Sequence, residues 1–255
     1  MMNALYSAAT GMEAMQQGMD MIAQNLANVN TTGFKSSRLT FEDLLYQQIG
    51  DRQASRLGAQ IGMGVAPGRT QLQFSQGDLQ PSDVPTNMAM EGNGFFQVVL
   101  PSGELGYTRD GNFTPDANGQ LVNSSGFRLE PSVVIPTEVN SDSVTIGTTG
   151  RVTGQLNGNN IILGQIDVAS FVNPEGLYAL GNNTYAATVN SGPATVGTPG
   201  DPGLGVIRQG FLEGSNVKTM DEMVNMITAQ RAFESVAKVL STSDEMLGIA
   251  NSIRR

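Results

Sequence analysis

Apolar residues recur through residues 1–33 with the period of an amphipathic helix. They follow one another at spacings of three and four: Leu5, Ala8, Met12, Met15, Met19, Ile22, Leu26 and Val29. This heptad repeat predicts a helix over residues 3–29 with one apolar stripe suited to a coiled-coil partner. Gly33 follows the stretch and suits the left-handed conformation found after many helix ends.

A second helix of the same character is predicted at the other end of the chain. Thr219 and Glu222 have the spacing of a capping box, which starts a helix. One heptad track follows, interrupted by Gln230 and Asp244: Met223, Met226, Phe233, Ala237, Leu240 and Leu247. The apolar face is widened by Val224, Ile227, Val236 and Ile253. Either helix alone would be an ordinary core helix, but two matched stripes predict that the helices pair with each other.

Between the two helices the pattern changes to short runs with turn signals between them. The run Gln165–Phe171 alternates as a half-buried strand should. The candidate strands are Phe95–Leu100, Leu105–Arg109, Gln120–Asn123, Val133–Ile135, Ser143–Ile146, Ile161–Leu163 and Gln165–Phe171. Turn dipeptides such as Asp110-Gly111 and Asn118-Gly119 separate them. The predicted fold is mixed: an all-β central domain flanked by N- and C-terminal α-helices that pair as a coiled coil.

Composition and patterning together predict three parts. Residues 1–33 and 215–255 form the terminal helical coiled-coil domain, residues 34–80 and 200–214 form a connecting extended or β segment, and residues 81–199 form an outer β domain. Within the connecting segment, the spacing of Phe41, Leu44, Leu45 and Ile49 indicates a short helical face.

The net charge and the absence of certain residue types limit which reactions, metal sites and partners are possible. The 255 residues include no Cys, His or Trp, so thiol chemistry, imidazole catalysis and Cys/His metal sites are excluded. The 14 basic and 23 acidic residues give a net charge of −9, which disfavours nucleic acid as a partner. No apolar run is long enough to span a membrane, and no basic start precedes an apolar block, so we expect neither membrane insertion nor a cleaved signal peptide.

No catalytic, cofactor or metal site is expected. Gly62-Met63-Gly64 and Gly92-Asn93-Gly94 lack the third glycine of a dinucleotide fingerprint. Asp110-Gly111-Asn112 resembles part of a calcium loop but has no closing Glu. Paired carboxylates such as Asp221 and Glu222 fit a solvated helix face better than an acid–base pair.

Several motifs resemble those of the bacterial flagellar axial proteins, the subunits of the rod and hook. The resemblance covers both ends and the middle of the chain, in Asn25–Lys35, Gly92–Val98, Tyr107–Phe113, Gln209–Val217, Glu222–Ile227 and Gln230–Glu234. Within the family it is nearest to the subunits of the distal rod. A rod-specific segment that hook proteins lack follows the first motif: Phe41, Glu42, Asp43, Leu44, Leu45, Tyr46 and Gln47. The short stretch between motifs, and Phe233 in place of a common tyrosine, leave a proximal-side sibling or a hook protein as alternatives.

The resemblance implies a helical tubular polymer whose paired terminal helices line a narrow channel and whose β domain faces outward. It also implies a rod that crosses the periplasm inside ring-shaped bushings and is exported without a cleaved signal peptide. The implied partners are the chain itself, neighbouring rod and hook proteins, the ring proteins and the export apparatus. A secreted β-rich binding module and a carboxylate-based hydrolase remain as alternatives of other classes.

The two apolar stripes are the candidate self-assembly interface. Its residues are Leu5, Met12, Met15, Met19, Ile22, Leu26 and Val29 from the first helix, and Met223, Met226, Ile227, Phe233, Leu240 and Leu247 from the second.

Overall fold

A computed structural model describes residues 2–49, 59–139, 143–156 and 158–253. The chain folds as two compact units. The helical unit comprises Met1–Ala27, Ser37–Gln71 and Lys218–Arg255, and the β unit comprises Asn28–Ser36 and Leu72–Val217. The three-part division expected from composition stays a prediction.

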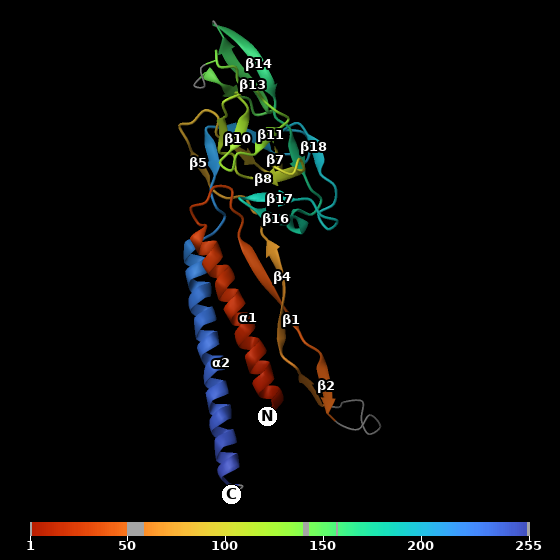
Figure 1. Ribbon diagram of the computed structural model, residues 1–255, viewed down its shortest axis with the longest axis vertical. Coiled ribbons are helices and arrows are strands. Elements are labelled where there is room, and N and C mark those ends of the chain that lie inside the picture. The colour runs from red at the N-terminus through yellow and green to blue at the C-terminus, as the bar shows by residue number, and fades with distance from the viewer. Residues whose placement is uncertain (1, 50–58, 140–142, 157, 254–255) are drawn as a thin grey trace. The chain divides into compact units, whose positions relative to one another are not determined.

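The helical unit is built on the two chain ends. Helix α1 (Met2–Ala27) has 26 residues, and helix α2 (Thr219–Ile253) has 35. They run antiparallel and pack against each other (Figure 1), which confirms the predicted pairing. The N–H of Glu222 donates to the carbonyl of Lys218 over 3.0 Å. Lys218 therefore occupies the N-cap position, and the capping box predicted at Thr219 is wrong by one residue.

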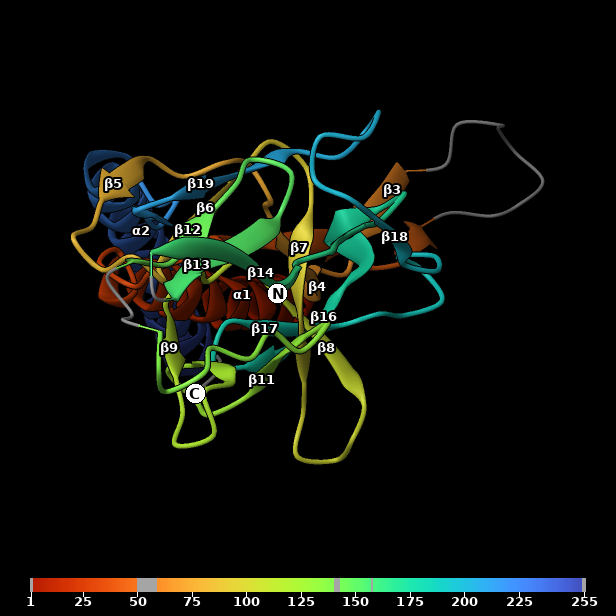
Figure 2. The same cartoon turned by 90° about the horizontal axis from the view of Figure 1, so that it is seen from above.

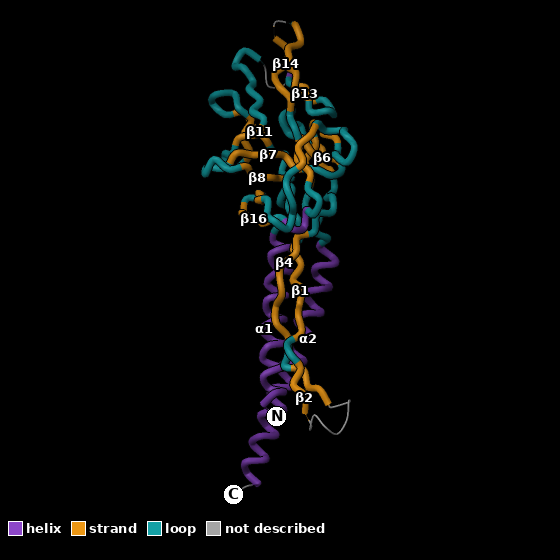
Figure 3. The backbone as a smooth tube through the Cα atoms, turned by 90° about the vertical axis from the view of Figure 1, so that its right-hand side faces the viewer, coloured by secondary structure: helices purple, strands orange, loops and turns teal. Residues whose placement is uncertain are grey.

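A long two-stranded ribbon completes the helical unit. It is formed by β1 (Ser37–Asp43) with β4 (Val65–Leu72), continued by β2 (Tyr46–Ile49) with β3 (Ala59–Gly62). Figures 1 and 3 show β1 and β4 side by side along α1, which lies between them and α2. Tyr46 stands opposite Gly62, and the N–H of Leu44 donates to the carbonyl of Gly64 over 3.0 Å.

This ribbon corrects the helical face predicted at Phe41, Leu44, Leu45 and Ile49, because those residues lie on or between strands. Local spacing fitted a helix, but Leu39 and Phe41 also alternate with polar neighbours as a strand does. Pairing with another strand of the ribbon, β4 for Phe41 and β3 for Ile49, decides between the two.

The β unit is organised around one nine-stranded sheet. Its main path runs β16-β17-β8-β7-β11-β10-β9, with β15 pairing β7 and β18 pairing β15. Figure 2 labels β7, β8, β16 and β17 of this path. The strands are β7 (Phe95–Val99), β8 (Leu105–Thr108), β9 (Phe113–Pro115), β10 (Leu121–Asn123), β11 (Arg128–Glu130), β15 (Val168–Ser170), β16 (Tyr178–Gly181), β17 (Thr184–Ala186) and β18 (Thr195–Gly197).

Smaller strand groups flank this sheet. One contains β12 (Thr145–Ile146), β13 (Arg151–Leu156) and β14 (Asn159–Gln165). Two further pairs are β6 (Met88–Glu91) with β19 (Val206–Gln209), and β5 (Leu79–Pro81) with β20 (Phe211–Glu213). A 3-10 turn, η2 (Pro174–Gly176), precedes β16.

Two clusters fill the interior of the β unit. The larger is aliphatic and includes Val98, Leu129 and Val152, each at most 1% exposed. The smaller is aromatic: Phe74, Phe95, Tyr107, Phe171 and Tyr185 meet edge to face, with centroids as close as 4.8 Å.

One predicted strand is absent. Residues 133–135 form an isolated bridge between Gln120 and Val134. Pro131 and Pro136 flank this run, and a proline cannot donate to a strand ladder.

Candidate functional site

The predicted stripe of α1 is partly covered within the helical unit. Leu5, Met12, Met15, Met19, Ile22 and Leu26 are all half-buried. Val29 lies in a turn beyond the end of α1, so it does not extend the helical stripe. The opposite row of α1, which includes Tyr6, Glu13 and Asp20, is exposed and mostly polar.

The half-buried track of α2 matches the predicted one in part. It runs at spacings of four and three through Glu222, Met226, Ala229, Phe233, Val236, Leu240 and Ser243. Met226, Phe233 and Leu240 therefore belong to it, as predicted. Ala237 of the predicted track is half-buried, as is Val236, which the sequence placed on the widened apolar face. Gln230 and Asp244, which interrupted the predicted track, are exposed.

Other apolar residues of α2 are exposed. The exposed large side chains are Met220, Met223, Val224, Ile227, Val239, Met246 and Ile249, with exposed fractions from 45 to 76%. The predicted assembly residues Met223 and Ile227 belong to this set. The side chain of Leu247 lies outside the described part of the chain. The second helix therefore has one apolar side for α1 and further apolar side chains that the described residues leave exposed.

A buried amide ties the three segments of the helical unit together. Asn25 of α1 is 3% exposed. Its Oδ1 accepts from the Ser37 N–H over 2.9 Å, and its Nδ2 donates to the Ser37 carbonyl over 2.9 Å and to Oε1 of Glu222 over 3.2 Å. Asn25 thus fixes α1 against the start of β1 and the first turn of α2.

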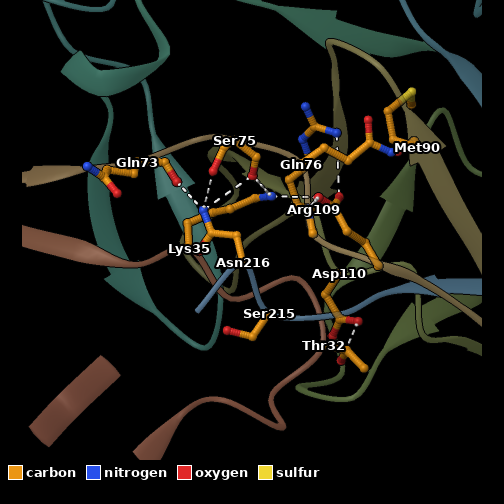
Figure 4. Close-up of polar contacts among 12 residues, drawn as sticks. Thr32, Lys35, Gln73, Ser75, Gln76, Met90, Arg109, Asp110, Ser215 and Asn216 are labelled. Atoms are coloured by element: carbon orange, nitrogen blue, oxygen red, sulfur yellow. Dashed lines mark hydrogen bonds and ion pairs between the residues drawn. The ribbon is translucent and has the colours of Figure 1, made fainter. Parts of the chain in front are cut away.

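A buried carboxylate plays the corresponding part in the β unit. Both oxygens of Glu213, which is 0% exposed, are used. Oε1 accepts from Lys35 Nζ over 2.5 Å and from the Gly77 N–H over 2.9 Å, and Oε2 faces Arg109 Nη1 at 3.5 Å. Lys35 also donates to the Ser75 carbonyl over 2.8 Å (Figure 4). One carboxylate therefore holds two cations from distant parts of the sequence.

Burial shifts the proton affinities of these groups. It lowers the pKa of the Lys35 ammonium, against the opposing attraction of Glu213. It also lowers the pKa of Arg109, again opposed by Glu213. The pKa of the Tyr185 hydroxyl is raised, chiefly by burial. The cluster is thus a dry ionic site in which burial opposes the charged forms of Lys35 and Arg109.

A second set of contacts joins residues 32–36 to the rest of the β unit. The hydroxyl of Thr32 donates to Asp110 over 3.0 Å (Figure 4), and the Gly33 N–H donates to the Glu213 carbonyl over 2.7 Å. Asn216 accepts from the Ser36 N–H over 2.8 Å and donates to the Gln73 carbonyl over 2.7 Å. Burial raises the pKa of Asp110, although hydrogen bonds from the Asn112 N–H and Thr32 act in the other direction.

A glycine is required at position 33, where the backbone passes close to that of Asp110. Its φ is +68°, and a Cβ there would lie 2.6 Å from the backbone nitrogen of Asp110. The left-handed conformation predicted for Gly33 is confirmed, but six positions after α1 ends rather than at its cap.

The rod-specific segment exposes apolar groups. Phe41, Leu45 and Tyr46 are 46, 84 and 57% exposed. Glu42 and Asp43 are exposed and Leu44 is half-buried, while the side chain of Gln47 is outside the described part. A hydrogen bond to Asp43 raises the pKa of the Tyr46 hydroxyl.

Two polar junctions, the contacts of Asn25 and the ionic cluster around Glu213, were not predicted from the sequence. Their members Asn25, Lys35, Arg109, Glu213 and Glu222 all lie in the motifs that carried the resemblance. The sequence did contain a signal for the Lys35 site, since Lys35 is one of only three lysines and closely follows the turn residue Gly33. Among the described residues, no group of His, Cys, Asp or Glu could hold a metal ion, and no helix is long and apolar enough to cross a membrane.

Comparisons with known proteins match the chain at both ends and in the middle. Residues 5–35 match the family described as flagella basal body rod protein. Residues 89–154 match the flagellar hook protein FlgE/F/G D1 domain, and residues 208–253 match the flagellar basal body rod FlgEFG protein C-terminal family.

Full-length relatives agree with these matches. The flagellar basal-body rod protein FlgG of Borreliella burgdorferi is 46% identical, over 100% of both chains. The FlgG protein of Buchnera aphidicola subsp. Schizaphis graminum is 45% identical, over 97% of this chain and 98% of the relative. A flagellar basal-body rod protein FlgF from Mesorhizobium japonicum is 30% identical, over 97% of each. The chain belongs to the flagellar basal-body rod protein family.

The family matches coincide with the polar junctions of this rod protein. The N-terminal match contains Asn25 and Lys35, the middle match contains Arg109, and the C-terminal match contains Glu213 and Glu222. The protein is a structural subunit of the flagellar rod, and its family assembles with other rod and hook proteins in the basal body.

Proposed function

We propose that this protein is the subunit of the distal rod. It polymerises into a hollow helical drive shaft that transmits torque from the motor to the hook and conducts exported subunits. The observation that carries the proposal is the set of exposed apolar side chains on α2, which includes Met223 and Ile227. Burying one such side chain against a neighbour contributes about 1.5–3 kcal/mol.

If the exposed side chains of α2 pack against a neighbouring copy, repetition of that contact favours a polymer. A patch on one copy that fits a different patch on the next is a heterologous contact, and such contacts generate open helical assemblies unless the rotation closes. Phe233 and Leu240 of the predicted interface lie on the half-buried side of α2 and hold the helix pair together. The pair in turn presents the exposed apolar side chains of α2 to a neighbouring copy.

Sequence identity to the relatives favours assignment of this chain to the distal rod. The relatives named FlgG are markedly more similar to this chain than the one named FlgF, over equally complete alignments. The rod-specific segment, typical of distal-rod subunits, supports the same assignment. We further propose that its exposed Phe41, Leu45 and Tyr46 bridge adjacent subunits and stiffen the shaft.

The position in the cell follows from this function. A distal rod crosses the periplasm inside ring proteins that act as bushings, and its subunits leave through the flagellar export apparatus without a cleaved signal peptide. The acidic β domain, residues 81–199, is the part proposed to face the rings. The terminal helices, residues 1–33 and 215–255, are proposed to form the tube, with residues 34–80 and 200–214 between.

The test separates assembly from folding. Met223→Asp combined with Ile227→Asp places charges on the exposed side of α2, where the free chain needs no apolar group. We expect a folded monomer with unchanged far-UV circular dichroism, no rods in electron micrographs and loss of swimming. Asn225→Asp is the control, because it adds a charge at a neighbouring exposed polar position. Rods of normal length from the double variant would contradict the proposal.

A further inference from the structure

A pocket opens in the β unit beside the buried ionic cluster. Its volume is about 300 Å³, and its walls include Phe74, Phe95 and Phe171 with Ser170 and Arg109. Val172, at its rim, is 89% exposed. The pocket therefore combines aromatic walls with one fixed cation.

Arg109 has few acceptors for a buried guanidinium. The residue is 3% exposed, and an arginine carries five N–H donors. Within the described part of the chain, its one hydrogen bond runs from Nη1 to Glu213 over 3.5 Å, and Nε has no partner. Charge-assisted bonds of this kind are ordinarily about 2.7–2.9 Å long. Its other contact is with the Phe95 ring, whose centroid lies 5.1 Å from Cζ.

The charges of the ionic cluster also indicate that Arg109 lacks a full partner. Lys35 and Arg109 share the single carboxylate of Glu213, and Lys35 has the shorter contact. The nearby carboxylate of Asp110 is engaged by Thr32 and by the Asn112 N–H. One buried positive charge is thus left without a full partner, and the pocket is where an anion could reach it.

We propose that this pocket receives a carboxylate side chain from a second copy of this chain. The aromatic walls suit the methylene stem of a Glu or Asp, and the guanidinium suits its two oxygens. Charge complementarity selects the occupant, because each copy carries 23 acidic against 14 basic residues and so presents surplus carboxylates to its neighbours. The choice of a second copy rests on the proposed rod function.

Benzoate tests the site in the intact protein, with neutral benzamide as its isosteric control. In dilute ¹⁵N-labelled protein we expect benzoate to shift the Arg109 side-chain signals saturably and to bind at least tenfold more tightly than benzamide. Equal binding of the two, or no shift, would overturn the site.

Self-association tests the occupant. In sedimentation runs at rising protein concentration, saturating benzoate should weaken association at least tenfold, whereas benzamide should not. If benzoate binds but association is unaffected, the second copy is not the occupant. A chain that binds benzoate yet never self-associates would contradict the rod polymer and its occupant while upholding the carboxylate site.

Discussion

Asn25 and Glu222 lie 197 positions apart in the chain, yet the amide of one donates to the carboxylate of the other over 3.2 Å. This contact joins the C-terminal end of α1 to the first turn of α2. It brings together two motifs from opposite ends of the sequence, so the helix pair is specified by a polar contact as well as by its apolar stripe. The register of the two helices should therefore depend on it.

Reversing the polarity of this contact should destabilise the helical unit. In Asn25→Asp, a carboxylate replaces the donor amide and faces both Glu222 and the Ser37 carbonyl. We expect a loss of about 2–3 kcal/mol, because the new buried carboxylate oxygen has no donor and faces two acceptors. Adding Glu222→Gln should restore about 1 kcal/mol, since glutamine can donate to the new carboxylate. Thermal unfolding followed at 222 nm measures both, and an additive double variant would show that the two residues are not coupled.

The ionic cluster should respond unequally to loss of its members. Glu213→Gln leaves Lys35 and Arg109 buried without a counter-charge, and we expect a cost of about 3–5 kcal/mol. Lys35→Met leaves the Arg109–Glu213 pair electrically balanced, so its cost should be nearer 1–2 kcal/mol, roughly that of the lost hydrogen bonds. Urea unfolding followed by near-UV circular dichroism of the buried Tyr107 and Tyr185 reports on this unit. Equal losses would mean that charge balance does not govern the cluster.

Gly33 and Gly103 offer a matched pair of glycine substitutions in the β unit. Gly33 and Gly103 both have positive φ, +68° and +85°, but a Cβ at Gly103 meets nothing within 4 Å. Gly103→Ala should therefore cost only the backbone penalty, about 1 kcal/mol. Gly33→Ala should cost about 1–3 kcal/mol more, because its methyl group collides with the backbone of Asp110. Urea midpoints at constant slope provide the comparison, and similar midpoints would exclude the clash.

The sequence predicts what depends on local periodicity. The heptad stripe of α1 identifies its helix. The run Gln165–Phe171 is not one strand, since Gln165 ends β14 and β15 covers only Val168–Ser170. The predicted track of α2 is half-buried at Met226, Phe233, Ala237 and Leu240, whereas Met223, Val224 and Ile227 are apolar but exposed. Their apolarity matches the proposed assembly rather than the fold of one copy.

Elements and sites that depend on distant partners were not predictable in this way. Phe41 and Leu45 fit helical and extended spacings alike, and the ladder with β3 and β4 decides between them. Lys35 and Glu213 are separated by 178 positions, so neither residue reveals from its own surroundings that it is buried and paired. Charged side chains are ordinarily exposed, and only the tertiary contact makes this pair an exception.

Asp110 should make stability depend on pH. Burial raises its pKa in the folded protein, so the stability it contributes is fully present below the unfolded value of about 3.9 and is lost as pH rises through the folded value. Asp110→Asn keeps an Oδ1 acceptor for Thr32 and the Asn112 N–H but cannot ionise. The variant should gain stability relative to the native protein between pH 4 and pH 7. Urea unfolding at several pH values measures the difference, and a difference that shrinks with rising pH would contradict the assignment.

The exposed ribbon gives the sharpest test of the proposed bridge between subunits. Removing residues 41–47 would also leave β3 and β4 without partners, so a point substitution is preferable. Leu45 is 84% exposed, and Leu45→Ser should leave the monomer's thermal unfolding within about 0.5 kcal/mol of the native value.

If Leu45 packs against a neighbouring subunit, this variant should give short or bent rods in electron micrographs and smaller swimming rings on soft agar. Glu42→Ser, an exposed polar change nearby on the same ribbon, should give straight rods of full length. Straight, full-length rods from both variants would remove Leu45 from the bridge. Defective rods from both would show that the ribbon is sensitive to any surface change, which would refute a specific apolar contact at Leu45.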